Sequence, residues 1–276
     1  MGPVSATRWG DLGLRVISAA VLIPVVLAAL WAGGAWFLLL IAVVGVAMAY
    51  EWTTIVHARN ATQFVLHAAA ALSGAILVPN VGIPITLLVI LLLLLPQSYL
   101  LRSAQTGPWG YLGIPYVALP PVALMSLRAD PQLGLAAMIW LFAVTWASDI
   151  GAYFVGRMIG GPKLIPAISP NKTWAGAVGA ILISALVAAL LARILTGAVF
   201  MPALLGAVLS IVAQAGDLFK SLLKRRHGLK DSGDLIPGHG GVIDRVDGLV
   251  AAAVAASLIG AMRSGSGAIG QGLLAW

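Results

Sequence analysis

Charged side chains that could bind phosphate and a cation are concentrated between Asp217 and Asp247. The chain has 16 Lys and Arg and nine Asp and Glu, and eleven of these 25 residues lie in this segment. On a helix, Asp217, Ser221 and Lys224 share one face. Asp244 and Asp247 are three residues apart and can share a face of the next helix. Because carboxylates from two helix ends can converge on one hard cation, we predict that these three Asp residues are metal ligands. Ser221 and Lys224 beside them are candidates for substrate binding.

A glycine-rich turn lies between these two groups, at 237–241, and reads Pro-Gly-His-Gly-Gly. Glycines let a ligand approach the backbone closely and expose N–H groups to an anion. Gly240 and Gly241 are therefore predicted to bind substrate, and His239 to take part in catalysis. A tight loop with a structural His is the plain alternative. No second His or Cys is spaced to make His239 a transition-metal ligand.

Basic residues run through the same segment. They could form a patch attracted to anionic lipid, worth about 1 kcal/mol per residue near the surface, and this interpretation suits Arg225 and Arg226. Lys230 adjoins Asp231, and Arg245 also follows an Asp. Such mixed charge favours a site for phosphate and metal. Lys230, Asp231 and Arg245 are therefore predicted to be catalytic.

A second polar segment comes earlier in the chain. Asp149 interrupts an apolar stretch long enough to span a membrane, where an ionisable residue is a functional candidate by default. Lys172 falls at the start of a predicted helix, where the helix dipole disfavours a positive charge, so a phosphate is its expected partner. Asp149, Ser169 and Lys172 are thus predicted to bind substrate, and Lys172 also to act in catalysis. Ser169 and Pro170 also suit the N-terminal boundary of the helix that follows, which is the alternative role of Ser169. For Asp217, Asp244 and Asp247 the alternative is an ion pair with a neighbouring Lys or Arg at the lipid head groups.

The elements that position these residues are predicted from composition. The chain is 61% hydrophobic and 9% charged, whereas soluble domains carry roughly 25% charged residues. We therefore predict an all-α, polytopic transmembrane bundle that forms one integral membrane domain over 1–276, with N-terminal spans in 1–130 and a catalytic half in 131–276. A spanning helix needs about 20 apolar residues, and nine stretches qualify: 14–32, 35–52, 61–78, 81–100, 109–127, 132–154, 174–195, 198–216 and 246–263.

The distribution of positive charge predicts the orientation. With a cytoplasmic N-terminus and alternating spans, thirteen of the 16 Lys and Arg residues face the cytoplasm and three, Arg128, Arg193 and Arg263, face the other side. This asymmetry is typical of membrane proteins. It also explains the net charge of +7 without nucleic acid as a partner. The chain has no cysteine, which excludes thiol chemistry.

The polar segments together resemble the signature of the phosphatidate cytidylyltransferases, or CDP-diacylglycerol synthases. Residues 146 to 250 carry the resemblance, and the first half matches only in hydropathy and at Glu51-Trp52. Family members often have Glu where this chain has Ala175, so no role is assigned to this position. If that Glu helps to hold a cation or nucleotide, its absence should weaken the affinity. The matching stretches are Asp149-Ile-Gly-Ala-Tyr, Ser169-Pro-Asn-Lys-Thr-Trp, Gln214-Ala-Gly-Asp-Leu, Ser221-Leu-Leu-Lys-Arg, Lys230-Asp231, Pro237-Gly-His-Gly-Gly and Asp244-Arg-Val-Asp.

The resemblance implies that CTP and phosphatidate react to give CDP-diacylglycerol and pyrophosphate, with Asp217 and Asp244 holding cations. The implied cofactor is Mg²⁺, with a second cation such as K⁺ left open. Membrane lipids are further partners, and the expected location is a bacterial inner membrane with the active site facing the cytoplasm. A homodimer is left open as well. The small residues Ala252, Ala256 and Gly260 permit close helix packing, either within the monomer or between two copies.

An ion-coupled transporter is the alternative from another class, since intramembrane carboxylates suit ion coupling. Against it, the charge is gathered on one side and no inverted repeat is evident. Other lipid-phosphate transferases would show different Asp patterns, which do not occur in this sequence.

Overall fold

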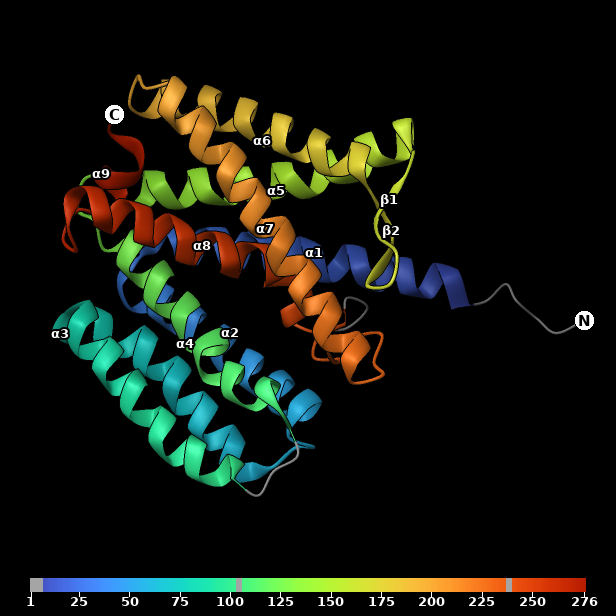
Figure 1. The fold of residues 1–276 in the computed structure, drawn as a ribbon. Coiled ribbons are helices and arrows are strands. Elements are labelled where there is room, and N and C mark those ends of the chain that lie inside the picture. Colours follow the sequence, from blue (N-terminus) through green and yellow to red (C-terminus); the bar gives the residue numbers. More distant parts are fainter. Residues whose placement is uncertain (1–6, 103–105, 237–239) are drawn as a thin grey trace, which may run out of the picture.

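The computed structural model describes residues 7–102, 106–236 and 240–276, and in these residues it shows a bundle of helices with one small hairpin (Figure 1). The side chains of 7–17 and 19 lie outside the description. The elements are α1 (Thr7–Ala32), α2 (Gly34–Val56), α3 (Ala61–Leu101), α4 (Pro108–Arg128), α5 (Gly134–Ile159), β1 (Lys163–Ile165), β2 (Ser169–Thr173), α6 (Trp174–Leu195), α7 (Phe200–Arg226), α8 (Ile243–Ser264) and α9 (Ile269–Leu274).

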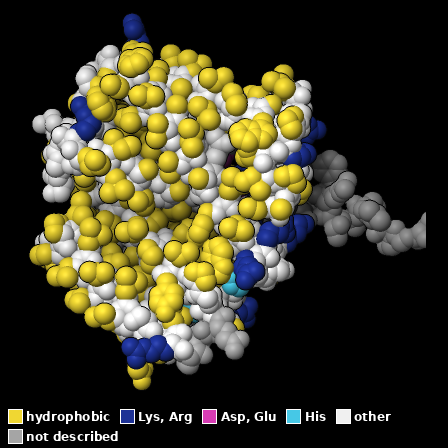
Figure 2. Space-filling model, in the orientation of Figure 1, with side chains coloured by type: hydrophobic (Ala, Val, Ile, Leu, Met, Phe, Trp, Pro, Cys, Tyr) yellow, Lys and Arg dark blue, Asp and Glu magenta, His cyan; other side chains and the backbone are white. Residues whose placement is uncertain are grey.

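The surface of the bundle is suited to lipid. Among the described residues, seven helices, α2 to α8, are long and apolar enough to cross a membrane. On α6, Leu182, Leu186, Leu190 and Ile194 follow one another at four-residue spacing, and all are more than half exposed. Figure 2 shows a mainly hydrophobic face, with Lys and Arg gathered chiefly along its right edge. The chain is therefore a multi-pass, nearly all-helical membrane protein, as its composition predicted.

The predicted segments 61–78 and 81–100 both fall within α3, which bends sharply between them. Gly82 has φ 80° and ψ 172°, a non-helical conformation that favours glycine. Pro84 has no N–H to continue the helical ladder. Beside it, the Gly82 carbonyl accepts a hydrogen bond from Thr86 Oγ1 at 2.7 Å. In Figure 1 the chain turns back at this kink, so that α3 has two arms of about one membrane span each.

The prediction of an all-α fold was wrong at one place, where β1 and β2 form an antiparallel hairpin. Gly160 and Gly161 have φ of 67° and 90°, and Pro162 follows directly, so α5 cannot continue. The hairpin carries Lys172 on β2, which corrects its predicted place at a helix start. That helix, α6, begins at Trp174 and is capped by Thr173, whose Oγ1 accepts the Gly176 N–H at 3.1 Å.

Small residues and buried polar bonds join α5, α6 and α7. Trp140 Nε1 on α5 donates to the Ala188 carbonyl of α6 at 2.9 Å. The hydroxyls of Ser148 on α5 and Ser210 on α7 lie 2.8 Å apart. Such bonds are favoured in a membrane because lipid offers no alternative partner. These three helices pack together, and the hairpin projects from the end of α5 and α6 (Figure 1).

The stripe of Ala252, Ala256 and Gly260 packs within the chain. Ala252 and Ala256 have no exposed surface, and a Cβ at Gly260 would lie 2.8 Å from the Ile269 side chain of α9. Of the two packing partners that the sequence allowed for this stripe, the structure shows the intramolecular one.

Candidate active site

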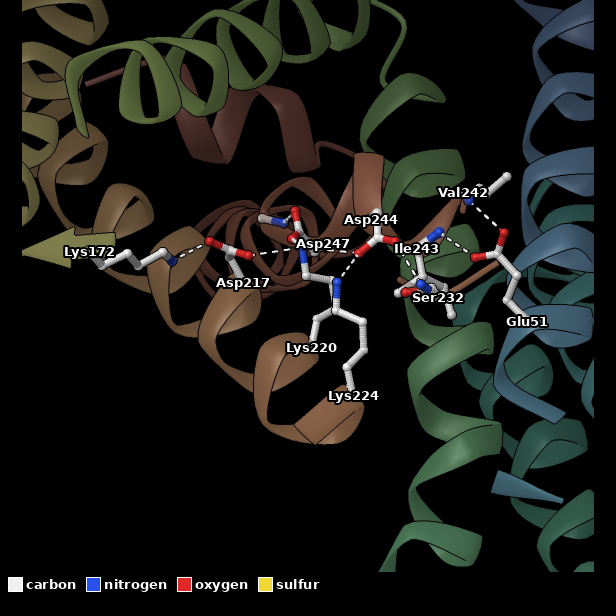
Figure 3. A network of polar contacts seen from close by, with 11 residues as sticks. Glu51, Lys172, Asp217, Lys220, Lys224, Ser232, Val242, Ile243, Asp244 and Asp247 are labelled. Atoms are coloured by element: carbon white, nitrogen blue, oxygen red, sulfur yellow. Dashed lines mark hydrogen bonds and ion pairs between the residues drawn. The ribbon is translucent and has the colours of Figure 1, made fainter. Parts of the chain in front are cut away.

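Three carboxylates from two helices surround one ammonium group in the centre of the charged segment (Figure 3). Lys220 Nζ on α7 lies 2.9 Å from Asp217 Oδ1 and 3.5 Å from Asp244 Oδ1, and it forms an ion pair with Asp247. Lys224 Nζ, one turn further along α7, is 2.5 Å from Asp244 Oδ1. The Lys220 side chain is only 10% exposed. A buried charge is costly unless it is paired. The three carboxylates therefore stabilise the buried Lys220 ammonium.

The helices α7 and α8 approach closely at this point because each carries a glycine beside an acidic residue. A Cβ at Gly216, next to Asp217, would lie 2.7 Å from both the Ala251 side chain and the Asp247 carbonyl. A Cβ at Gly248, next to Asp247, would lie 3.4 Å from the Ala213 side chain. Gly216 thus allows a contact that any larger residue would push apart. The crossing sets the two carboxylates on either side of Lys220.

The hairpin supplies a further cation from outside the bundle. Lys172 of β2 reaches α7 and forms an ion pair with Asp217. The network then holds three ammonium groups, those of Lys172, Lys220 and Lys224, and the three Asp carboxylates. Its charges balance, so a bound polyanion would need additional positive charge nearby.

A polar cleft of about 550 Å³ opens beside the cluster, between α5, the hairpin, α6 and α7. Asp217 and Lys172 form part of its wall, together with Asp149 of α5. Two further basic residues line it, Arg157 at the end of α5 and Lys163 at the start of β1. The cleft thus combines three cations with two carboxylates, which suits a polyphosphate bound together with a metal ion.

An apolar cleft of about 400 Å³ lies on the other side of α7, between α4, α7 and α8. Its lining includes the rings of Tyr116 and Phe219, whose centroids are 5.7 Å apart. Asp247 is the charged residue in its wall. The carboxylate cluster therefore lies between a polar cleft, which Asp217 lines, and an apolar one, which Asp247 lines.

The donor set fits the predicted divalent cation. Carboxylate oxygens are the ligands that hard cations prefer, and the Lys220 ammonium marks a point within reach of Asp217, Asp244 and Asp247. As placed, however, the described residues contain no group of three or more His, Cys, Asp or Glu side chains that could hold a metal ion. In the structure these Asp residues form ion pairs with lysines, which is the alternative role that the sequence allowed. Lys220 takes up the oxygens that a metal would need, so the metal site stays a prediction.

The structure brings together Asp217, Asp244, Asp247, Lys172 and Lys224, with Asp149 in the adjoining cleft. Among the other predicted residues, Gly241 packs against Glu51, while Gly240 has φ 81° and bridges to Ile236. His239 lies outside the described residues. The remaining predicted residues line neither cleft. They are exposed Lys230 and Asp231 in the α7–α8 loop, exposed Arg245 on α8, and half-buried Ser221 on α7 and Ser169 on β2.

Two central residues had no predicted role. Lys220 was grouped with the basic patch, although its position three residues after Asp217 places both on one face of α7. Glu51 of α2 accepts hydrogen bonds from the Val242 and Ile243 N–H groups at 2.6 and 2.8 Å. It lies inside the predicted span 35–52, where an ionisable residue is a functional candidate, and the resemblance also includes Glu51-Trp52. No local spacing connects it to α8.

The fold and the charged cluster define an integral membrane protein with a candidate site for phosphate chemistry. Similarity to known proteins identifies the family. A family model described as "Cytidylyltransferase family" matches residues 13–262, and the chain therefore belongs to the cytidylyltransferase family. A phosphatidate cytidylyltransferase of Brucella suis is 44% identical over 260 residues, covering 91% of this chain and 94% of that protein. One of Pseudomonas aeruginosa is 36% identical, covering 86% and 93%.

Proposed function

We propose that this protein is a phosphatidate cytidylyltransferase, which joins the cytidylyl group of CTP to phosphatidate and releases pyrophosphate. The observation that carries the proposal is the cluster around Lys220, which lies between a polar and an apolar cleft. A water-soluble nucleotide and a lipid can therefore meet at one charged centre. The names of the relatives support the same activity. The alternative of an ion-coupled transporter has no support from them.

The reaction needs alignment and charge neutralisation more than a protein nucleophile. An oxygen of the lipid phosphate attacks the α-phosphorus of CTP, forming a P–O bond while the bond to the leaving pyrophosphate breaks. The second pKa of a phosphate monoester is near 6, so the attacking oxygen is largely ionised at neutral pH. Two anions must nevertheless approach each other. Fixed positive charge around the transferred group lowers that barrier.

The polar cleft suits CTP. Arg157, Lys163 and Lys172 come from three different elements and line one space of about 550 Å³. Lysine and arginine groups are the usual protein partners of phosphate oxygens. In this arrangement Lys172 transfers part of its interaction from Asp217 to the triphosphate, which frees a carboxylate oxygen for a cation.

The apolar cleft suits the glycerol end and upper acyl chains of phosphatidate. It is lined mainly by aliphatic and aromatic side chains of α4, α7 and α8, with Asp247 beside the cluster. A lipid there would present its phosphate to Lys220 and Lys224 while the chains remain in apolar surroundings.

The charge balance of the cluster favours a cation as cofactor. Mg²⁺ held by Asp217, Asp244 and Asp247 would neutralise the developing phosphate charge. A second cation such as K⁺ is compatible with the same oxygens.

The membrane arrangement that we propose has nine spans, counting α1 and the two arms of α3, with the N-terminus in the cytoplasm. The split of Lys and Arg residues supports this orientation. It places the cluster at the cytoplasmic side of a bacterial inner membrane, where CTP is available. A homodimer would have to use a surface other than the stripe at Ala252, Ala256 and Gly260, which is covered within the chain.

The test is an assay of purified protein in detergent with CTP, phosphatidate and Mg²⁺, which follows pyrophosphate release and the lipid product. Pyrophosphate that appears only when both substrates are present supports the proposal. A second assay measures ion flux in liposomes. Flux without any pyrophosphate release would instead identify a transporter and reject the enzyme.

A further inference from the structure

The side chain of Glu51 joins the N-terminal half of the chain to the start of α8. Glu51 is 1% exposed, and its two oxygens accept separate hydrogen bonds, Oε1 from the Val242 N–H at 2.6 Å and Oε2 from the Ile243 N–H at 2.8 Å. Figure 3 shows the carboxylate facing these two groups from α2. The contact spans more than 190 positions of the sequence, and it holds the point where α8 begins.

Helix α8 needs this partner because it has no side-chain cap of its own. Val242 occupies the N-cap position, and no side chain of that residue caps the helix. The first N–H groups of a helix lack partners within the helix, and the helix dipole favours an anion at this end. Glu51 meets both requirements from a different helix.

The loop before α8 is shaped around the same carboxylate. A Cβ at Gly241 would lie 2.7 Å from Glu51 Oε2, and a Cβ at Gly233 would lie 3.3 Å from Oε1. Gly241 needs to be glycine for the backbone to come this close, and a Cβ at Gly233 would make a tight contact. The carboxylate is thus enclosed by the loop and by the helix start, with little freedom to move.

Asp244 follows Ile243 directly and links this anchor to the charged cluster. Its Oδ2 accepts the Ser232 N–H at 2.8 Å, and its Oδ1 pairs with Lys224. Asp247, one turn further along α8, contacts Lys220. Any shift of the first turn of α8 would therefore move two of the three carboxylates of the cluster.

We propose that Glu51 is a positioning residue for cytidylyl transfer, which fixes the first turn of α8 so that Asp244 and Asp247 face Lys220. This inference rests on the proposed function. Glu51 acts through the backbone and lines neither cleft. A displacement of about 1 Å at reacting groups can cost about 100-fold in rate. Loss of Glu51 should accordingly lower kcat and leave the binding of CTP nearly unchanged.

The experiment compares Glu51→Gln and Glu51→Asp with a matched control. Glutamine keeps the size but turns an NH₂ group toward one of the two N–H donors, whereas aspartate keeps both acceptor oxygens on a shorter side chain. The control is Asp130→Asn. Asp130 is also buried, and it accepts backbone N–H groups of Gln132, Leu133 and Gln271, next to α9 at the opposite end of α8.

We expect Glu51→Gln to lower kcat about 100-fold with the KM for CTP within about twofold, and Glu51→Asp to recover part of the loss. Glu51→Gln and Asp130→Asn should lower the melting temperature in detergent by similar amounts. Asp130→Asn should nevertheless leave kcat within about threefold of the wild-type value. Hydrogen exchange should become faster at Val242 to Asp247 in Glu51→Gln. If Glu51→Gln keeps wild-type kcat, or if Asp130→Asn loses as much kcat, the positioning role is wrong.

The same measurements separate this inference from the proposed function. If the wild-type protein releases no pyrophosphate, the proposed function fails, and hydrogen exchange decides the placement of α8 by itself. Faster exchange confined to the first turn of α8 would support the anchor at Glu51. Unchanged exchange there would overturn it.

Discussion

Lys172 of the hairpin forms an ion pair with Asp217 of α7, and both side chains are about one quarter exposed to the polar cleft. The pair thus closes the bundle on one side and faces the proposed nucleotide site on the other. Asp217 keeps a second partner in Lys220 at 2.9 Å. Lys172 can therefore turn to an incoming anion without leaving Asp217 uncompensated.

Replacing Lys172 should weaken CTP binding. A hydrogen bond to a charged group contributes about 1.5–3 kcal/mol, so we expect Lys172→Gln to lower kcat/KM for CTP by about 10- to 100-fold, mostly through KM. The control is Arg226→Gln, an exposed residue at the end of α7 that does not line the cleft, with an expected change within twofold. Steady-state kinetics at varied CTP measure this. An unchanged KM with a lower melting temperature would make Lys172 a structural ion-pair partner.

Removing the charge of Asp217 or Asp244 should nearly abolish turnover. Stabilisation by a metal ion is worth several kcal/mol, so either Asp→Asn change should lower kcat by orders of magnitude. The double variant should lose little more, because residues that act as one unit fail together. Asp234→Asn is the control, since Asp234 is an exposed carboxylate in the α7–α8 loop. Activity should also disappear with a chelator and return with Mg²⁺. Near-normal Mg²⁺-dependent activity in both single variants would contradict the metal assignment.

The fold could be predicted largely from apolar runs because lipid imposes a minimum length on each span. The predicted segment 174–195 coincides with α6, and the other predicted spans lie mostly within helices. The ends were less predictable. Helix α7 runs ten residues beyond its predicted end, to Arg226, because Asp217, Lys220 and Lys224 pair inside the protein and do not need water. The hairpin was missed because its strands are too short for a periodic pattern.

The site could be predicted only in part. The Asp residues and Lys172 were identified by charge in an apolar context and by the resemblance. In the sequence, Lys220 looks like any basic residue at the lipid head groups. Only the packing of α8 against α7 shows that Asp244 and Asp247 surround it. Glu51 did carry a signal, as an ionisable residue inside the predicted span 35–52, but its partners could not be predicted. They are the backbone N–H groups of Val242 and Ile243, and backbone donors leave no trace in residue type.

The orientation can be tested with introduced cysteines, since the chain has none. Gly228 would be a poor position because its φ is 67°. We instead choose exposed Leu229 after α7 and exposed Ser266 after α8. A membrane-impermeant maleimide added to intact cells should label Ser266→Cys, and Leu229→Cys only after permeabilisation. Leu182→Cys, in the lipid-facing stripe of α6, should resist labelling in both cases. Labelling of both loop positions from the same side would refute the nine-span arrangement.

His57 should make stability depend on pH. It lies at the end of α2, is 8% exposed, and its Nε2 has no hydrogen-bond partner among the described residues. Burial lowers the pKa of His57 to about 4, and the neighbouring His67 and His227 add to this effect. The unfolded chain, with a pKa near 6.5 at this residue, therefore binds more protons than the folded protein between these values. The contribution of neutral His57 to the free energy of unfolding is fully present above pH 6.5, and it is lost progressively as the pH falls toward 4.

We therefore expect the melting temperature in detergent to fall between pH 7 and pH 5, and the fall to be smaller in His57→Gln. Glutamine has a similar size and does not titrate, so it removes the proton linkage at this position. Above pH 7.5 the two proteins should show parallel, nearly flat profiles, which serves as the internal control because His57 is neutral there in both the folded and the unfolded state. Equal slopes for both proteins between pH 7 and pH 5 would show that His57 does not control acid stability, and that other groups titrate in this range.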